Sequence, residues 1–265
     1  MEVGLRTPLL DFFRRGEVAR DVRLLAAQGG LAPRAHEQLG LLMLLVGDQD
    51  PEIASTAEST LQSIPPGSIS AFIARSDVST EMREFFVQRG IEPADIPAAE
   101  ADEPLIDAAP QEPEAEGEGE GEGEGTDEEK HQNALQKIAS LNVAQRVALA
   151  TKGSREERAI LIRDPNKIVA VAVLSSPKMT DSEAESIAKM ANVSDEILRI
   201  IAFTRAWVKN YGVVLALAKN PKTPVAVSMN LLSRLNEKDL RLLSTDRNVP
   251  DVLRVTARKK LVMDK

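Results

Sequence analysis

The chain has 265 residues with a formal net charge of -8, 43% apolar residues and only 3% aromatic residues, so aliphatic side chains and alanine must fill its core. It contains no cysteine, which excludes disulfides, thiolate metal sites and a cysteine nucleophile. We find no apolar core of signal-peptide type, and the longest apolar run is far shorter than the roughly 20 residues of a membrane span. We expect a cytoplasmic protein of one or two domains with no membrane contact.

The charge is unevenly distributed along the chain. Residues 1–95 carry 9 Arg and no Lys against 14 acidic residues, and residues 96–129 carry 14 acidic residues and no basic one. Residues 130–265 carry 24 Lys and Arg against 13 Asp and Glu, a net charge of +11. An acidic average therefore conceals a basic carboxyl-terminal region.

Residues 1–92 show the start and stop signals of several short helices, which predict an N-terminal helical-repeat domain. Thr7-Pro8 predicts an N-cap and a first helical residue. Gly29-Gly30 predicts the left-handed end of a helix. We expect helices over residues 8–15, 17–28, 33–46, 51–64 and 79–89.

Residues 93–129 have the composition of a disordered linker. The segment holds five prolines and many alanines, followed by strict Glu-Gly alternation over residues 116–125. Like charges repel, glycine makes ordering costly, and almost nothing is available to bury. A flexible chain of this length has a root-mean-square span of roughly 30 to 40 Å. We interpret it as a tether; that it folds back over the basic region is a further hypothesis, and a solubilising spacer is the alternative.

Residues 130–265 are predicted to form a basic C-terminal helical-repeat domain. Ser154 with Glu157, and Thr180 with Glu183, fit the capping box, in which a hydroxyl and a carboxylate satisfy each other's backbone N–H groups. The β-branched run at residues 168–173 is typical of a strand. Its alignment with residues 225–229 in the repeat described next favours a helix.

A short sequence motif recurs every 28 residues: Asp164-Pro165, Asn192-Val193, Asn220-Pro221 and Asn248-Val249. Aliphatic pairs at helical spacing follow each copy: Val169 and Val173, Ile197 and Ile201, Val225 and Met229, Leu253 and Ala257. A 28-residue unit accommodates two short helices and two turns, as in an α-solenoid. We interpret the Asp and Asn residues as helix-start signals that fix the stacking register, rather than as a row of ligands. Residues 50–83 parallel residues 164–199, which indicates that the two halves are duplicates.

The sequence motifs of the repeat resemble those of a known protein family. Asn220-Pro221-Lys222-Thr223-Pro224 and residues 246–254 resemble bacterial HEAT-like and leucine-rich-repeat-variant proteins. The resemblance covers residues 142–265 well and residues 17–90 more loosely; it departs from that family in the 28-residue spacing and in the absence of a cysteine cluster for an iron–sulfur centre. It implies a stacked helical scaffold and leaves activity open. Together with the composition of residues 93–129, it leads us to predict an all-α fold with two HEAT-like α-solenoid domains joined by a disordered acidic linker.

No catalytic, metal or cofactor motif is recognisable. The two histidines, His36 and His131, lie one in each half with no second histidine or cysteine at ligand spacing. Lys152-Gly153-Ser154 lacks the upstream glycine of a phosphate-binding loop and is interpreted as a turn with an N-cap. We therefore predict a protein that is not an enzyme, with no catalytic residue, no metal and no cofactor.

The candidate binding residues are basic or aromatic and lie on related repeat helices. They are Arg199, Arg205, Trp207, Lys209, Tyr211, Arg254, Arg258, Lys259 and Lys260. Rows of cations can form an electrostatic footprint for phosphate backbones or acidic proteins; the alternative is that they are solvated helix faces. Exposed, the two aromatic residues could stack on a base or anchor a partner. Buried, they fill the gap between units, which is the reading we favour.

We predict a non-enzymatic interaction scaffold or adaptor that offers an extended surface to a protein partner, because repeat arrays expose broad, regularly spaced positions. The alternative is a nucleic-acid-binding module on the basic domain, of the HEAT-like DNA-alkylation-repair type. Such a module would require an aromatic residue and a carboxylate converging in a cleft, and Trp207 has no recognisable partner of that kind.

Overall fold

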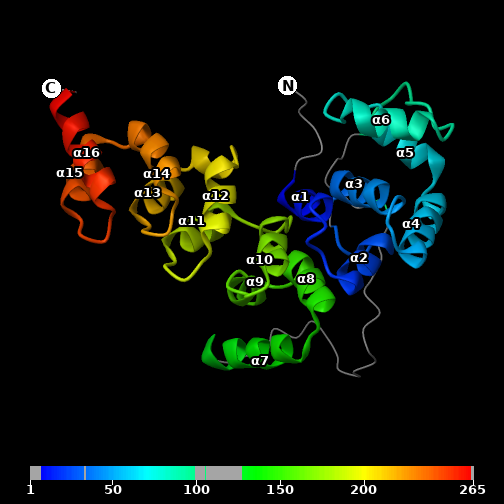
Figure 1. The fold of residues 1–265 in the computed structure, drawn as a ribbon, viewed down its shortest axis with the longest axis horizontal. Helices are drawn as coiled ribbons and strands as arrows, with labels where there is room; N and C mark the ends of the chain where they lie inside the picture. The colour runs from blue at the N-terminus through cyan, green and yellow to red at the C-terminus, as the bar shows by residue number, and fades with distance from the viewer. Residues whose placement is uncertain (1–6, 33, 99–104, 106–126, 264–265) are drawn as a thin grey trace. The chain divides into compact units, whose positions relative to one another are not determined.

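A computed structural model describes residues 7–32, 34–98, 105 and 127–263 (Figure 1). Every regular element in these ranges is a helix, which confirms the all-α fold class. Within the described residues no helix is long and apolar enough to cross a membrane. The chain divides into two compact units, Met1–Lys178 and Met179–Lys265, and each is described separately.

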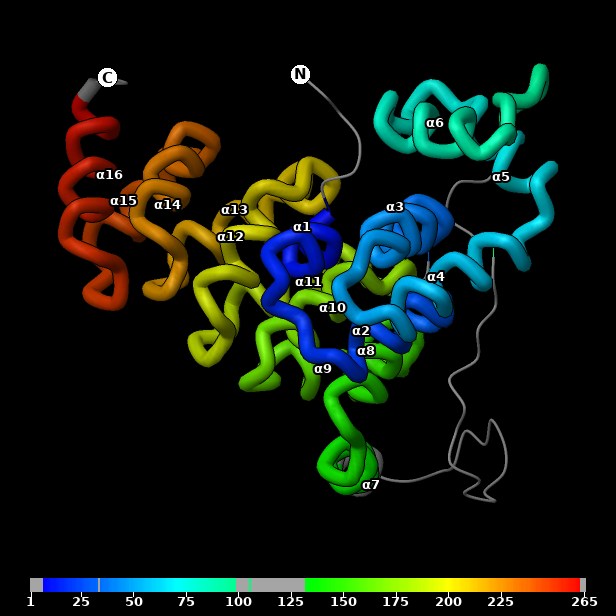
Figure 2. Tube along the Cα trace, turned by 45° about the vertical axis from the view of Figure 1, so that its right-hand side comes forward, coloured from blue at the N-terminus to red at the C-terminus, as the bar shows by residue number. Residues whose placement is uncertain are grey.

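The first unit contains ten α-helices among its described residues. Their bounds are α1 (Pro8–Arg14), α2 (Arg20–Ala27), α3 (Ala35–Leu45), α4 (Pro51–Ser63), α5 (Pro66–Ile73), α6 (Thr80–Val87), α7 (Asp127–Ser140), α8 (Val143–Lys152), α9 (Arg155–Leu161) and α10 (Lys167–Leu174). Figure 2 follows the same helices as a continuous tube.

The local signals place most of these helices correctly. The Thr7 side chain accepts a hydrogen bond from the Leu10 N–H at 3.4 Å, and Pro8 begins α1. Gly29, which follows α2, has φ of 82°, the left-handed conformation expected after a helix end. The capping box predicted before α9 is present. Helix α5 was not among the predicted helices, although Pro66 is its first residue and a proline is favoured at a helix start.

Both ends of the predicted linker differ from the prediction. Residues 92–98 are ordered against α5: the Ser70 hydroxyl donates to the Glu92 carbonyl at 2.6 Å, and the Ala98 N–H donates to the Ala71 carbonyl at 2.8 Å. Helix α7 begins at Asp127, inside the predicted linker. Ordered structure therefore enters the predicted segment from both sides. The disorder predicted for residues 99–104 and 106–126 lies outside the described residues.

The first unit combines helices from both sides of this linker. Helix α2 contacts α8, and α1 contacts α10. Every residue of α10 after Lys167 is buried, so this helix needs neighbours on all sides. The β-branched run at 168–173 is thus a helix, as its place in the repeat predicted. The compact unit extends to Lys178, whereas the predicted domains are joined by the linker at residues 93–129; the division into domains at residues 1–92 and 130–265 stays a prediction.

Helices α1–α4 and α7–α10 repeat one contact pattern. In each set the first helix contacts the third, the second contacts the third and fourth, and the third contacts the fourth. An ion pair recurs as well: Arg23 of α2 contacts Asp48 at 2.5 Å, and Arg146 of α8 contacts Asp164 at 2.6 Å. The two acidic residues also play the same part in the backbone turn, because each accepts a hydrogen bond from the N–H two residues later.

This pattern supports the duplication but shifts its register by two residues. The sequence comparison aligned Asp50 with Asp164. In the structure Asp48 corresponds to Asp164, and Asp50, the N-cap of α4, corresponds to Asn166, the N-cap of α10. The alignment of the two halves by sequence matched their Asp-Pro dipeptides. Residues with the same capping role, Asp50 and Asn166, give the correct register.

The second unit contains six α-helices and two short 3-10 helices among its described residues. They are α11 (Asp181–Lys189), α12 (Asp195–Phe203), η1 (Trp207–Lys209), α13 (Tyr211–Lys219), α14 (Val225–Leu231), η2 (Leu232–Arg234), α15 (Glu237–Thr245) and α16 (Asp251–Met263). Contacts join neighbours in the chain, α11·α12, α12·α13, α13·α14 and α15·α16, and also helices two apart, α11·α13 and α14·α16.

The repeat is not strictly 28 residues long. The second helices of successive pairs begin at Lys167, Asp195, Val225 and Asp251. Counted from these starts, the third and seventh residues form the buried core: Val169 and Val173, Ile197 and Ile201, Val227 and Leu231, Leu253 and Ala257. The 28-residue interval aligns Val225 and Met229 with these buried pairs, but they are 41% and 38% exposed and lie outside the core.

A longer connection explains the shift. Seven residues, which include η1, separate α12 from α13, whereas five residues, which include η2, separate α14 from α15. This longer connection contains η1, which contacts both α12 and α13. Trp207, at 9% exposed, supplies the apolar volume that closes the enlarged junction. The additional residues displace the next helix start and move Val225 and Met229 out of the core.

Candidate interaction surfaces

An apolar surface lies on the second helices of the repeats in the second unit. Phe203 on α12, Met229 on α14, and Val252 and Val255 on α16 are 69%, 38%, 56% and 46% exposed. Counted from the helix starts, they occupy positions two, five and nine, which lie on the side opposite the buried third and seventh positions. Helices α14 and α16 contact each other, and α12 joins α14 through α13.

Two cations flank these apolar side chains. Arg199 precedes Phe203 by four residues on α12, and Lys259 follows Val255 by four residues on α16, so each cation lies beside an exposed apolar side chain. No hydrogen bond or ion pair within the described part of the chain holds either cation. We call the surface formed by Arg199, Phe203, Met229, Val252, Val255 and Lys259 the apolar-basic face.

Three predicted cations are engaged in intramolecular contacts. The Arg258 guanidinium donates to the Ser244 carbonyl through Nε at 3.2 Å and Nη2 at 3.0 Å, which ties α16 to the end of α15. The Lys260 ammonium donates to the Leu232 carbonyl at 3.0 Å. Arg254 pairs with Asp251 one turn earlier. The Arg258 and Lys260 contacts satisfy carbonyls near helix ends, whereas Arg254 pairs with a carboxylate of its own helix.

The two predicted aromatic residues also serve packing. Trp207 is buried, as the favoured reading expected. Tyr211 is 39% exposed, but its hydroxyl donates to the Asp239 carboxylate at 2.5 Å and accepts from the Asn236 N–H at 3.2 Å. Burial and the Asp239 hydrogen bond raise the pKa of Tyr211. Tyr211 therefore connects the start of α13 to the start of α15.

The remaining predicted residues, Arg205 and Lys209, lie between α12 and α13 on either side of Trp207. Both are exposed, and neither side chain has a hydrogen bond or ion pair with another described residue. The structure thus leaves four of the nine predicted residues available to a ligand: Arg199, Arg205, Lys209 and Lys259.

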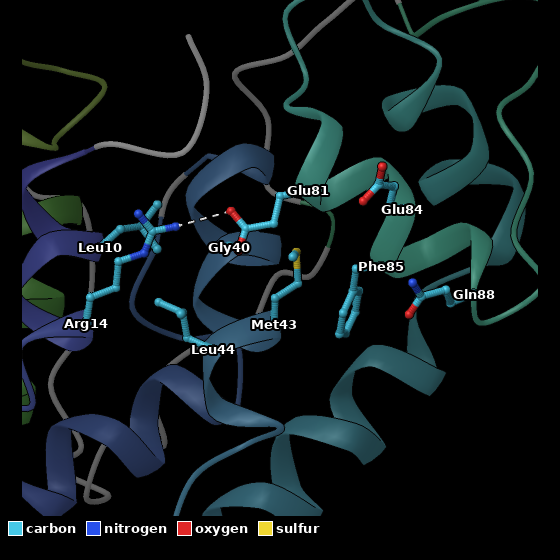
Figure 3. Close-up of a pocket in the computed structure, with 9 residues that line it drawn as sticks. All are labelled: Leu10, Arg14, Gly40, Met43, Leu44, Glu81, Glu84, Phe85 and Gln88. Carbon is cyan, nitrogen blue, oxygen red and sulfur yellow. Dashed lines mark ion pairs between the residues drawn. The ribbon is translucent and has the colours of Figure 1, made fainter. Parts of the chain in front are cut away.

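A pocket of about 290 Å³ lies among α1, α3 and α6 in the first unit (Figure 3). Residues at helical spacing supply its walls: Leu10 and Arg14 from α1, Gly40, Met43 and Leu44 from α3, and Glu81, Glu84, Phe85 and Gln88 from α6. Figure 3 shows Met43 and Phe85 between α3 and α6, with Arg14 and Glu81 meeting at one side. Met43, Leu44 and Phe85 are half-buried, so the pocket presents apolar surface to an incoming group.

Acidic residues line the α6 side of this pocket. Glu81 pairs with Arg14 at 3.6 Å, but its carboxylate is 67% exposed, so the pair is weak. Glu84 is exposed and forms no side-chain hydrogen bond or ion pair with a described residue. One uncompensated carboxylate therefore borders an apolar pocket, which favours an apolar group carried next to a cation.

A buried carboxyl group lies at the contact between the two four-helix sets. Glu37, in the first turn of α3, is 2% exposed and one of its oxygens, Oε2, has no hydrogen-bond partner. Desolvation raises the pKa of Glu37, while Arg34 and hydrogen bonds from Thr7 and Ser175 oppose this shift. Thr7 caps α1 and Ser175 follows α10, so Glu37 joins helices from both sets.

The described residues contain no group of three or more His, Cys, Asp or Glu side chains that could hold a metal ion. The half-buried His36 lies near Phe72, with ring centroids 6.4 Å apart. Desolvation lowers the pKa of His36, and the Asp77 carboxylate opposes this effect. The side chain of His131 is outside the described part of the structure.

Comparison of the chain with protein-family models, curated proteins and solved structures gives no match. The resemblance to helical-repeat proteins therefore rests on the phrases at residues 220–224 and 246–254 and on the repeated helix pairs.

Sequence reasoning missed the apolar half of the apolar-basic face. It aligned Val225 and Met229 with the aliphatic pairs of the other copies because it kept the 28-residue interval unchanged. Pro224 offered a signal: it is the N-cap of α14, so the helix begins at Val225, two residues later than the interval predicts. Once the helix starts are known, the exposure of Phe203 and Val252 follows from helical periodicity.

Proposed function

We propose that this protein is a non-enzymatic, helical-repeat scaffold whose apolar-basic face binds a protein partner. The supporting observation is the coincidence of exposed apolar side chains with unpaired cations at related positions on neighbouring helix pairs. Exposed apolar surface that continues across elements marks interaction sites in soluble proteins. The flanking cations favour a partner that is acidic as well as apolar.

Nucleic-acid binding by the same unit is the second candidate. The exposed cations Arg199, Arg205, Lys209 and Lys259 support it, because phosphate contacts need only accessible positive charge. The aromatic residues support it less: Trp207 is buried, and the Tyr211 hydroxyl is held by Asp239. A protein partner uses both the apolar and the basic side chains, so we favour it.

The test uses two amphipathic helical peptides with the same leucine face, one carrying glutamates and the other lysines on the opposite face. The probe is the ¹³C-labelled methyl group of Met229 in the full chain. We expect the glutamate peptide to shift this signal and the lysine peptide to leave it unchanged. Duplex DNA is titrated in parallel; tight binding with a steep salt dependence, without a response to the glutamate peptide, would favour the nucleic-acid candidate.

Matched substitutions locate the site. Val255→Asp places a carboxylate in the apolar-basic face and should weaken the glutamate peptide about tenfold or more through lost apolar contact and charge repulsion. Leu242→Asp is the control, because Leu242 is 51% exposed on α15 and lies outside the face. Equal effects of the two substitutions would contradict the proposed site.

A further inference from the structure

The chain carries two surfaces of opposite chemistry. The apolar-basic face presents Phe203, which is 69% exposed, with the unpaired Arg199 one turn before it. The pocket among α1, α3 and α6 presents an apolar wall with the unpaired Glu84 at its edge. A protruding aromatic side chain beside a cation thus has a complementary pocket beside a carboxylate in every copy of the molecule.

We infer that a second copy of this chain binds at these surfaces, with Phe203 of one copy entering the α1–α3–α6 pocket of the next. This inference rests on the proposed function, because it names a partner for the apolar-basic face. It assigns that partner from the size, polarity and charge of the pocket.

The size of the pocket suits an aromatic ring. Benzene binds in engineered protein cavities of about 150 Å³, and the pocket volume is about 290 Å³. The wall offers the kinds of group that contact aromatic rings well: the Met43 thioether and the Phe85 ring. Both side chains are half-buried, so each has surface left to lose on binding.

The charged residues beside the Phe203 ring and beside the pocket are also complementary. Arg199 and Phe203 have Cβ atoms roughly 5–6 Å apart, as residues four apart on a helix do. Glu84 and Phe85 are adjacent on α6. When the Phe203 ring lies against Phe85, the Arg199 guanidinium comes within reach of the Glu84 carboxylate. Both charges are unpaired within their own copy, so the contact replaces no intramolecular ion pair.

The contact joins two different surfaces, so each copy carries both a Phe203 to donate and a pocket to fill. Two copies that exchange Phe203 reciprocally form a closed symmetric dimer, and copies that do not exchange it reciprocally continue into rings or open chains.

Sedimentation velocity of the full chain, from micromolar to submillimolar concentration at low and moderate salt, tests the inference. We expect the weight-average sedimentation coefficient to rise with concentration, and more steeply at low salt. Phe203→Ala should lower the association constant about tenfold or more, because a buried ring is lost. Arg199→Glu and Glu84→Arg should each weaken association through repulsion. Lys238→Glu and Glu92→Arg make the same charge changes at exposed positions outside both surfaces and should have no effect.

A mixture of the two charge-reversed variants gives the decisive result. The pocket of the Glu84→Arg copy and the Phe203 surface of the Arg199→Glu copy again carry opposite charges, so an equimolar mixture should associate more strongly than either variant alone. All five substituted positions are exposed, and circular dichroism checks that each variant is folded.

Three outcomes would overturn the inference: a chain that remains monomeric throughout, variants that associate as strongly as the unmodified chain, or a mixture that shows no recovery. The proposed function is judged separately by the Met229 response to the glutamate peptide. A monomeric chain that binds this peptide overturns self-association and leaves the proposed function supported, whereas loss of both responses overturns both.

Discussion

Replacing Asn220 with alanine should destabilise the second unit strongly, while the same change at Asn192 should not. Both residues open a copy of the repeated phrase, so the sequence treats them as equivalent. Asn220 is 5% exposed, and its Nδ2 donates to the Ala188 carbonyl at 2.8 Å and to the Met190 carbonyl at 2.9 Å. Its Oδ1 accepts from the Lys222 N–H at 2.9 Å. Asn192 is exposed and has no hydrogen bond with a described residue.

The expected magnitude follows from these three contacts. Each hydrogen bond contributes roughly 1 kcal/mol net, so Asn220→Ala should lower the free energy of unfolding by about 3 kcal/mol. Two of the contacts connect α13 to the end of α11, so their loss weakens the stacking of neighbouring helix pairs. Asn192→Ala, a surface change, should stay within about 0.5 kcal/mol.

The assay is urea unfolding of the full chain, followed by tryptophan fluorescence. The chain has one tryptophan, Trp207, which lies buried in the second unit and reports on that unit. With a denaturant dependence of about 1.5 kcal/mol per M, a loss of about 3 kcal/mol lowers the urea midpoint by about 2 M. If Asn220→Ala and Asn192→Ala have the same midpoint, the assignment of Asn220 as a junction between helix pairs is refuted.

Three further changes test other features of the structure. The pKa of Glu37 lies above its ordinary value of 4.5 because burial disfavours the charged form, so the folded chain binds more protons than the unfolded chain in the window above that value. Stability relative to Glu37→Gln should fall as pH rises from about 4.5 and then level off; a urea-midpoint difference independent of pH would contradict this. Tyr211→Phe removes the hydroxyl contacts to α15 and should lower the free energy of unfolding by roughly 1 kcal/mol, followed by Trp207 fluorescence. An unchanged free energy of unfolding would contradict the connection between α13 and α15. Gly90 follows α6 at φ of 81°, so Gly90→Ala should lower thermal stability by about 1 kcal/mol in circular dichroism, whereas Gly67→Ala, which has open space and no positive φ, should not.

Local capping residues explain why so many helix starts could be predicted. Thr7, Ser154 and Thr180 each accept a backbone hydrogen bond at the start of a helix, as their spacing to the following residues indicated. Such caps depend on a few neighbouring residues, so they are visible without tertiary information. The missed α5 shows the limit of this reasoning, because a proline pair can end one helix and begin another.

The candidate site was predicted only in part, because exposure depends on packing. Arg199 and Arg258 both lie on repeat helices, so the sequence does not distinguish them. Only the structure shows that the Arg258 guanidinium donates to the Ser244 carbonyl, while the Arg199 side chain has no partner in the described residues. The 28-residue interval aligns Met229 with buried residues of other copies, but the observed start of α14 at Val225 places it on the exposed side of the helix. Charge and periodicity identify candidates, and the neighbouring helices decide which remain accessible.

The sequence by itself determined the all-α fold class, the helix starts marked by caps and prolines, and the approximate repeat, because these depend on interactions within a few residues. Only the tertiary structure decided the two-residue displacement of the third repeat and the different roles of Asn192 and Asn220. It also decided the packing of α1 and α2 against α10 and α8. Those features depend on how helices far apart in the chain fill volume around Trp207 and α10, and no local pattern encodes that fit.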